Sequence, residues 1–390
     1  MIDSHKMKLA FLSTYPPRAC GIATFTQDLV TELGKLPETP NIKVIAMSNA
    51  HDQYDAQVLF EIDQQNKASY LQIAQEVNHA AIDLLVVEHE YGIYGGKDGD
   101  YLLAFIVHLQ IPFVVTLHTV LSSPSEKQRQ ILNVLGQKAQ KVVTMAQNTV
   151  NILKDVYRID GTKIAVIHHG VPMRQREPRN ELKQKFELAG RSVVSTFGLL
   201  SPGKGLEYGI EAIAKVVQTH KDVLYLILGQ THPAVQKQSG ETYRESLEDQ
   251  VKQLHLCDNV RFVNRYLTKD EIIRYLQLSD VYMTPYLGKE QAVSGTLAYA
   301  VGYGRVIVST PYQYAKEMLA DGRGLLAEFG NVDSLAKQIT YVLEHPEEKR
   351  KMEQRTLRFG TQMLWPNVAE QYRTLFEEIL WQTAPGRHAV

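Results

Sequence analysis

The sequence predicts an α/β protein with two doubly wound domains, each built on a parallel sheet that helices cover on both faces. Its 390 residues exceed what one ordinary hydrophobic core holds, and two domains are typical of this length. Short, uniformly apolar runs alternate with amphipathic helical segments, a pattern typical of buried parallel strands. The pattern stops in a polar stretch at residues 171–181 and then restarts, which indicates a second domain.

The first domain is expected at residues 1–172 and is Rossmann-like. Helical patterns such as those at residues 27–35 and 70–81 separate its strands. The predicted strands lie at residues 8–13, 43–47, 83–88, 112–117, 141–145 and 163–167. Because these runs are apolar throughout, we expect strands that are buried on both faces.

Residues 173–190 are expected to link this domain to a second Rossmann-like domain at residues 191–364. The predicted strands of the second domain lie at residues 191–197, 223–229, 260–263, 281–285 and 305–310. Residues 365–390 predict a C-terminal amphipathic helix, because apolar and aromatic side chains recur at helical spacing after Pro366.

Composition and charge exclude several classes of protein. The chain has 42 basic and 43 acidic residues, whereas a dedicated nucleic-acid-binding protein carries a basic excess. No apolar signal segment opens the chain, and Pro112 interrupts its most hydrophobic stretch, residues 102–121. Cys20 and Cys257 lack metal-ligand spacing and indicate reduced thiols. We therefore expect a cytoplasmic protein with no nucleic-acid partner and no transmembrane segment.

The turn after the strand at residues 191–197 is the first candidate site. Ligands of doubly wound sheets bind at the carboxyl ends of the strands. Gly198 permits close backbone approach there, and Lys204 adds a positive charge where a helix begins with free N–H groups. The glycine spacing matches neither the P-loop nor the dinucleotide-binding motif. The pattern indicates an anion site, and a turn capped by a solvated lysine stays open as the alternative.

A second candidate follows the strand at residues 281–285. Ser294, Gly295 and Thr296 open a helix with hydroxyl and N–H groups, which suit a phosphate or sugar hydroxyls. Glu290, in the preceding loop, supplies a carboxylate that suits sugar hydroxyls or a positive charge forming on a sugar ring. The alternative is an ordinary helix cap beside a surface glutamate.

Polar residues also follow two predicted strands of the first domain. Residues 88–100 are dense in glycine, tyrosine and acidic groups, and His118 follows the strand at residues 112–117. A single histidine at a strand end is more often structural than catalytic, but the carboxyl edge of a buried strand is where chemistry is expected. Because neighbouring residues of a strand point to opposite faces, His89 and the glutamates beside it do not suggest a shared metal site. We expect neither a metal nor a cofactor.

Taken in order, these segments resemble the family 4 retaining glycosyltransferases of GT-B fold over nearly the whole chain. The resemblance is carried by residues 13–25, 114–120, 163–172, 196–205, 259–286, 305–311 and 317–326. The loop that reads EHEYGIYGG from Glu88 further resembles one bacterial subgroup. The family implies two Rossmann-like domains that face a central cleft, with the donor held mainly by the second domain and the acceptor by the first. It also implies that the final helix crosses back to the first domain.

The resemblance implies roles for individual residues. Lys204 matches the lysine that binds the donor diphosphate, and Glu290 matches the first glutamate of the family's E-x7-E motif. His118 matches the histidine near the transferred sugar, so Glu290 and His118 are the candidate catalytic residues. The expected donor diphosphate site comprises Gly198, Lys204, Ser294, Gly295 and Thr296. The residues expected to line the cleft are Arg18, Gly21, His89, Glu90 and Tyr91.

Two positions depart from the family pattern. Ala298 stands where the second glutamate of the motif, which commonly binds the donor ribose, is expected. Leu199 stands where the family often has a phosphate-binding arginine. Both departures weaken the expected recognition of the donor and leave the predicted class unchanged.

The resemblance predicts transfer of mannose or glucose from a nucleotide-diphosphate sugar to a hydroxyl of a carbohydrate or glycolipid, with retention at the anomeric carbon. GDP-mannose and UDP-glucose both fit, and we favour mannose. A lipid-linked acceptor would bring the protein into peripheral contact with the inner face of a membrane. Two alternatives stay open: a disaccharide phosphorylase of the same fold, and a non-catalytic protein that binds nucleotide sugars.

Overall fold

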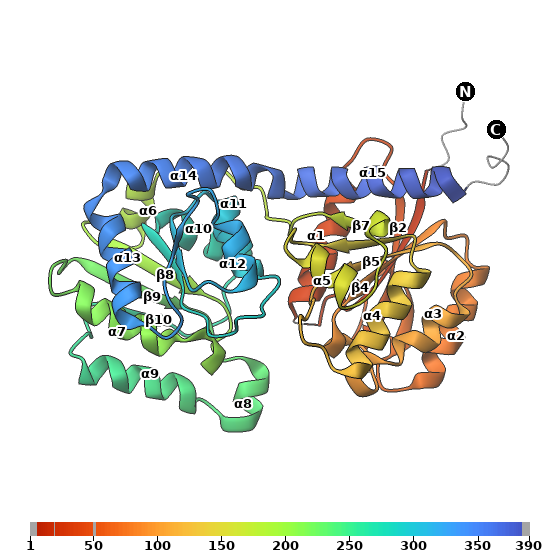
Figure 1. Cartoon of the computed structure of the whole chain (residues 1–390), viewed down its shortest axis with the longest axis horizontal. Coiled ribbons are helices and arrows are strands. Elements are labelled where there is room, and N and C mark those ends of the chain that lie inside the picture. Colours follow the sequence, from red (N-terminus) through yellow and green to blue (C-terminus); the bar gives the residue numbers. More distant parts are fainter. Residues whose placement is uncertain (1–5, 19, 50–51, 384–390) are drawn as a thin grey trace. The chain divides into compact units, whose positions relative to one another are not determined.

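The computed structural model describes residues 6–18, 20–49 and 52–383, and the chain divides into two compact units (Figure 1). Unit 1 comprises Met1–Pro172 with Leu364–Val390, and unit 2 comprises Met173–Met363. Each unit contains a parallel sheet whose central strands are buried on both faces. The predicted pair of doubly wound parallel sheets is therefore confirmed.

In the described part of unit 1, seven parallel strands form one sheet in the order β3-β2-β1-β4-β5-β6-β7. The strands are β1 (Lys8–Ser13), β2 (Asn41–Ser48), β3 (Val58–Asp63), β4 (Leu84–His89), β5 (Phe113–Leu117), β6 (Lys141–Thr144) and β7 (Ile164–Val166). Every residue of β4 and β5 is buried, because these strands lie in the middle of the sheet under helices.

The helices of unit 1 cover this sheet (Figure 1). They are α1 (Gly21–Leu33), α2 (Lys67–His79), α3 (Leu102–His108), α4 (Glu126–Lys138), α5 (Thr149–Asp155) and α15 (Trp365–Thr383), with short 3-10 turns η1 (Tyr91–Ile93), η2 (Lys97–Gly99) and η3 (Gly161–Lys163). Trp365, Tyr372 and Phe376 of α15 are buried with other apolar side chains at helical spacing, and α15 packs on α1. Residues 384–390 of the expected C-terminal helix lie outside the described residues.

The described sheet of unit 2 has six parallel strands in the order β10-β9-β8-β11-β12-β13. The strands are β8 (Ser192–Phe197), β9 (Val223–Leu228), β10 (Val260–Val263), β11 (Val281–Thr284), β12 (Ile307–Ser309) and β13 (Leu325–Leu326). The helices are α6 (Arg179–Lys185), α7 (Leu206–Val216), α8 (Pro233–Ser239), α9 (Thr242–Gln253), α10 (Lys269–Leu278), α11 (Gly295–Gly302), α12 (Gln313–Met318), α13 (Val332–Glu344) and α14 (Pro346–Gly360), with 3-10 turns η4 (Pro202–Lys204) and η5 (Thr361–Met363).

The two sheets share one strand order, and this order locates the sites. In each unit the first strand lies between the second and the fourth, so the order reverses between β1 and β4 and again between β8 and β11. Ligands of doubly wound sheets bind at such a reversal, outside the carboxyl ends of the strands. The segments that follow β1, β4, β8 and β11 carry nearly all of the candidate residues.

Three features differ from the sequence-based expectations. Strand β3 was not predicted because it lies at a sheet edge, where exposed residues alternate with half-buried ones and the buried Ile62 instead of forming an apolar run. Strand β13 was missed because it has only two residues. The segment expected as a linker, residues 173–190, contains α6 and lies within unit 2, where α6 packs on α10.

Among the described residues, no helix combines the length and the apolar character that a membrane span requires.

Candidate functional site

Strand β8 ends in a glycine turn that lies against the start of α11. Gly198 has φ +136°, and its backbone N–H donates to the Leu228 carbonyl at 2.9 Å. A Cβ atom at this position would lie 3.4 Å from the Thr296 methyl group, and the left-handed φ favours glycine. The structure therefore brings together two predicted donor-site residues, Gly198 and Thr296, that are far apart in the sequence.

Lys204 joins the same cluster through an aromatic ring. Its Nζ atom lies 3.9 Å from the centroid of the Tyr286 ring, a cation–π contact. The Tyr286 hydroxyl lies 3.0 Å from Thr296 Oγ1, so one side chain connects the lysine with the start of α11. Gly205 follows with φ +59°, and a Cβ there would lie 2.2 Å from the Pro285 carbonyl oxygen, which requires glycine.

Helix α11 presents its N-terminus to this cluster. Ser294 caps the helix by accepting a hydrogen bond from the Leu297 backbone N–H at 3.3 Å, and its hydroxyl lies 3.2 Å from Thr296 Oγ1. The first N–H groups of a helix, here those of Gly295 and Thr296, have no acceptor within the helix and carry the positive end of its dipole. The five predicted diphosphate residues thus gather where β8 and β11 end.

Three further positions from the sequence analysis contribute less to this cluster. Glu290 is exposed in the turn between β11 and α11. Ala298 is fully buried within α11, so this position offers no carboxylate to a ligand. Leu199 lines the small cavity beside Gly198 and Lys204, where it contributes no charge.

Stacked tyrosine rings lie against this cluster, and they were not among the residues predicted from the sequence. The rings of Tyr286 and Tyr312 stack at 5.5 Å between centroids. Burial raises the pKa of Tyr282 and Tyr312 well above the ordinary tyrosine value, so both phenols stay neutral. The signal in the sequence was an aromatic residue close to a strand end, Tyr286 two residues after β11.

In unit 1, His118 at the end of β5 pairs with Glu88 near the end of β4. His118 Nε2 lies 2.7 Å from Glu88 Oε2, and the two side chains are 7% and 0% exposed. A hydrogen bond therefore joins the imidazole Nε2 to one oxygen of this buried carboxylate. The backbone N–H of His118 also donates to the His89 carbonyl at 3.0 Å. The contact between Glu88 and His118 was not predicted, because Glu88 was considered from the sequence only as a metal ligand.

Glu90 and Tyr91 lie beside this pair at the end of β4. Thr119 donates to Glu90 Oε2 at 2.5 Å, and the other carboxylate oxygen of Glu90 accepts from the Tyr91 N–H at 3.0 Å. Glu90 thereby caps η1 and ties the loop after β4 to the loop after β5. Both predicted residues are thus placed at the carboxyl edge of the sheet.

Arg18 and Gly21 follow β1 at the same edge. Arg18 donates to Gln64 Oε1 at 2.9 Å, and Gln64 donates to the Gly92 carbonyl at 3.3 Å. Gly21 opens α1 directly after Cys20, whose sulfur accepts from the Ala23 N–H. The guanidinium of Arg18 is therefore linked through one glutamine to the loop that carries Tyr91.

Two further histidines lie beside the His118 pair, of which His89 is buried and His169 is half-buried. Burial, with the nearby charge of His118, lowers the pKa of His89 to about 3. Burial is also the main cause that lowers the pKa of His169 to about 4. Both imidazoles are therefore neutral at pH 7, and Phe25 contacts the rings of both His118 and His169.

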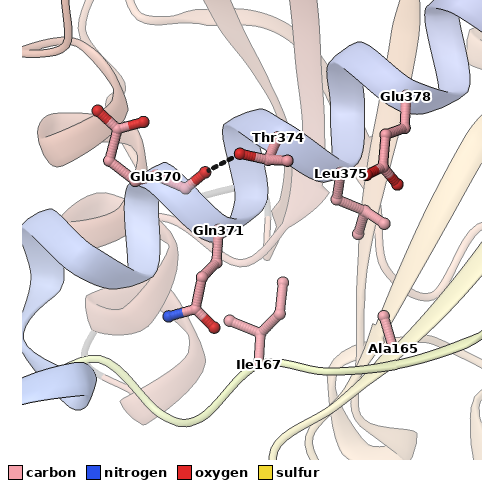
Figure 2. Close-up of a pocket in the computed structure, with 7 residues that line it drawn as sticks. All are labelled: Ala165, Ile167, Glu370, Gln371, Thr374, Leu375 and Glu378. Atoms are coloured by element: carbon pink, nitrogen blue, oxygen red, sulfur yellow. Dashed lines mark hydrogen bonds between the residues drawn. The ribbon is translucent and has the colours of Figure 1, made fainter.

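A larger cavity in unit 1, of about 340 Å³, lies away from these residues. Figure 2 shows it between α15 and the segment around β7, with Glu370 and Glu378 among the side chains that line it. Carboxylates repel a diphosphate, and none of the predicted site residues lines this cavity. Its size alone therefore does not make it the candidate site.

The described residues contain no group of three or more histidine, cysteine, aspartate or glutamate side chains arranged to hold a metal ion. Both cysteines, Cys20 and Cys257, are free thiols.

Two family models match consecutive parts of the chain. The model described as Glycosyltransferase Family 4 matches residues 21–175, and the model described as Glycosyl transferases group 1 matches residues 178–358. The chain belongs to the family 4 glycosyltransferases and has the GT-B fold.

Two curated relatives match part of the chain. Spore coat protein SA of Bacillus subtilis (strain 168) is 23% identical over 261 residues, which cover 64% of this chain and 65% of that protein. The uncharacterized glycosyltransferase MJ1069 of Methanocaldococcus jannaschii is 23% identical over 261 residues, covering 65% and 62%. This chain therefore spans less than two thirds of the length of these relatives.

Solved structures share the fold along the whole chain. Anabaena Alr3699/HepE in complex with UDP and glucose superposes with a TM-score of 0.73 at 18% identity, covering 95% of this chain and 100% of that one. Sucrose-phosphate synthase from Thermosynechococcus elongatus superposes with a TM-score of 0.79 at 14% identity, covering 97% and 100%. At these identities the superpositions support the fold.

Proposed function

We propose that this glycosyltransferase moves a hexose, with retention at the anomeric carbon, from a nucleotide-diphosphate sugar to a hydroxyl of a carbohydrate or glycolipid acceptor. The observation that carries the proposal is the cluster at the ends of β8 and β11. There the Lys204 ammonium, the glycine backbone of Gly198 and the N-terminus of α11 converge. A fixed cation beside unpaired N–H groups is suited to a diphosphate.

The chemistry that this cluster supports is departure of the nucleoside diphosphate. When the bond to the sugar breaks, negative charge builds on the leaving phosphate and positive charge builds on the sugar ring. Lys204 and the first N–H groups of α11 would stabilise the phosphate charge. Glu290 would bind sugar hydroxyls and stabilise the cationic ring, while His118, held by Glu88, would position the transferred sugar.

UDP-glucose is the first donor to test. Alr3699/HepE from Anabaena has been crystallised in complex with UDP-glucose, and it shares the fold of this chain. We keep GDP-mannose as the second donor, as the resemblance of the sequence suggests. The acceptor class is a free or lipid-linked carbohydrate, and the first domain is where we expect it to bind.

The test of the donor site is the variant Lys204→Ala. Loss of one charge-assisted contact of about 1.5–3 kcal/mol should weaken UDP or GDP binding by about 10- to 100-fold. Titration calorimetry with both nucleotides measures the affinity. Lys215→Ala is the matched control, because Lys215 lies in the last turn of the adjacent α7 and pairs with Asp333 at the surface. Equal affinities for wild type and Lys204→Ala would refute the assignment.

A non-catalytic nucleotide-sugar-binding protein is the second candidate function, because Ala298 and Leu199 replace two ligand-binding residues of the family pattern. Product formation separates the candidates. The enzyme should release UDP or GDP from its nucleotide sugar when an acceptor is added, and Glu290→Ala should lower that rate. Nucleotide-sugar binding without turnover across an acceptor panel would favour the second candidate.

A further inference from the structure

An unassigned cavity lies at the opposite edge of the unit 2 sheet from the candidate donor cluster. It has a volume of about 190 Å³ and is lined by Arg176, Glu177, Arg179, Gln277, Tyr303, Arg305 and Glu353. Gln277 lies near the end of α10, just before β11, and Arg305 lies two residues before β12. Because the strands are parallel, their starts share one edge and the donor cluster lies at the other. The cavity is therefore separate from the proposed donor site.

Three arginines line this cavity from two segments, Arg176 and Arg179 at the start of α6 and Arg305 before β12. Arg305 donates from Nε to the Tyr303 carbonyl and from Nη1 to the Gln277 carbonyl, each at 3.1 Å, so its guanidinium is held rigidly. Burial and the neighbouring charge of Arg179 lower the pKa of Arg305 to about 10, and Arg176 acts in the same direction. At neutral pH these are like charges facing a shared space, which an anion would stabilise.

The two carboxylates that line the cavity are both paired, Glu353 with an arginine of the cavity itself and Glu177 with cations outside it. Glu353 forms an ion pair with Arg179, which connects α14 with α6. Glu177 pairs with Lys185 at 2.7 Å and with Arg274 at 3.2 Å. Cations thus outnumber the carboxylates around the cavity.

Two guanidinium groups retain unused hydrogen-bond donors. Arg176 forms no hydrogen bond or ion pair with the described part of the chain, although it lines the cavity. The Nε atom of Arg179 is buried and has no acceptor among the described residues. A buried donor without a partner costs free energy, and an arriving oxyanion would remove that cost.

We propose that this cavity binds a phosphoryl group. A phosphate oxyanion accepts hydrogen bonds from several guanidinium groups at once, and the planar fork of arginine matches its geometry. The volume far exceeds the roughly 10–15 Å³ that a single water needs, so it admits an anion of this size. The phosphoryl group comes either from free phosphate or from a lipid headgroup, and the same three arginines would recognise both.

The test uses the full chain with Lys204→Ala, so that phosphate at the proposed donor site does not contribute. Inorganic phosphate is titrated by calorimetry at constant ionic strength, and binding to vesicles of phosphatidylglycerol in phosphatidylcholine is measured by sedimentation. Adding Arg176→Gln should weaken one or both interactions about 10-fold or more. Arg176 is exposed and has no partner to lose, so its substitution leaves the fold intact.

Arg174→Gln is the matched control, because Arg174 lies on the same segment, pairs with Asp270 and does not line the cavity. It should change either affinity by less than about threefold. Arg176-dependent binding of phosphate alone identifies free phosphate as the source, and Arg176-dependent vesicle binding identifies a lipid headgroup. Absence of both interactions, or affinities that Arg176→Gln leaves unchanged, would overturn the proposal.

Discussion

Lys204 and His118 are each oriented by a contact with another side chain. The Tyr286 ring lies under the Lys204 ammonium, and Glu88 accepts a hydrogen bond from His118. Glu88 is fully buried, and its second oxygen has no hydrogen-bond partner among the described residues. Such a costly arrangement points to a role in orienting the imidazole.

At this scale we predict that Glu88 positions His118 for turnover. Glu88→Ala removes the acceptor and should lower kcat about 10- to 100-fold, which corresponds to the free energy of one hydrogen bond to a charged group. The KM for the donor should change less than about threefold. Glu88→Gln keeps an oxygen acceptor and should restore part of kcat. Steady-state kinetics measure both parameters, and Glu61→Ala, at an exposed position of β3, is the control. An increase in KM alone would contradict a positioning role.

At the scale of elements, a buried carboxylate joins α6, β8, β11 and α14. Asp280, which directly precedes β11, accepts from Lys183 at 2.5 Å, from Lys349 at 2.7 Å and from the Val193 N–H at 2.8 Å. Burial by itself would raise the pKa of Asp280, but Lys349 and Lys183 outweigh it and lower the pKa to about 2. This network makes the segment at residues 173–190 part of unit 2, which a polar composition could not indicate.

We therefore predict that Asp280→Asn destabilises unit 2. The substitution leaves two buried ammonium groups without a counter-charge, a change that typically costs about 3–5 kcal/mol of the free energy of unfolding. Denaturant unfolding followed by circular dichroism measures the loss. Asp249→Asn, which breaks an exposed pair with Lys252 on α9, should change stability little. Equal effects of the two substitutions would show that the Asp280 network is not a major source of stability.

In the whole molecule, the same strand order occurs in both sheets, but the side chains at the two reversals of that order differ. The reversal between β8 and β11 carries a fixed cation and a helix N-terminus, which suit an anion. The reversal between β1 and β4 carries Arg18, Glu90 and Tyr91, with His118 directly after the neighbouring β5. Unit 1 also holds two neutral histidines, the buried His89 and the half-buried His169, and their lowered pKa values make its stability depend on pH.

We predict that unit 1 loses stability as the pH falls below about 6.5. Unfolded histidine binds a proton near pH 6.5, whereas the folded pKa values are about 3 for His89 and about 4 for His169. Between these values the unfolded state holds more protons, so each histidine costs up to about 1.4 kcal/mol per pH unit. Above about pH 6.5 neither histidine reduces stability; as the pH falls, the loss accumulates down to about pH 4 for His169 and about pH 3 for His89.

Denaturant unfolding at pH 7.5, 6 and 5 tests this prediction through the slope of stability against pH. His89→Leu removes one of the two proton-binding sites and should make the slope shallower than in wild type. His79→Gln, at an exposed position of α2, should leave the slope unchanged. A wild-type slope in His89→Leu would contradict the prediction.

The fold class, the family and most of the buried strands could be predicted from the sequence, because continuous apolar runs and glycine turns are local patterns. The sequence did not reveal β3, since an edge strand needs no apolar run, nor β13, since two residues form no pattern. For the candidate sites, it indicated Lys204, the start of α11 and His118, because each lies in a segment that follows a strand.

Contacts between residues that are distant in the sequence became known from the three-dimensional structure. Tyr286 under Lys204, Glu88 against His118 and the arginine cavity of unit 2 all combine side chains from separate strands and helices. Such contacts depend on strand order, and the order in a parallel sheet is set by long-range packing of helices on both faces. The glycine turns are local patterns in the sequence. Tyr286 and Glu88, which orient Lys204 and His118, come close to them only in the folded sheets.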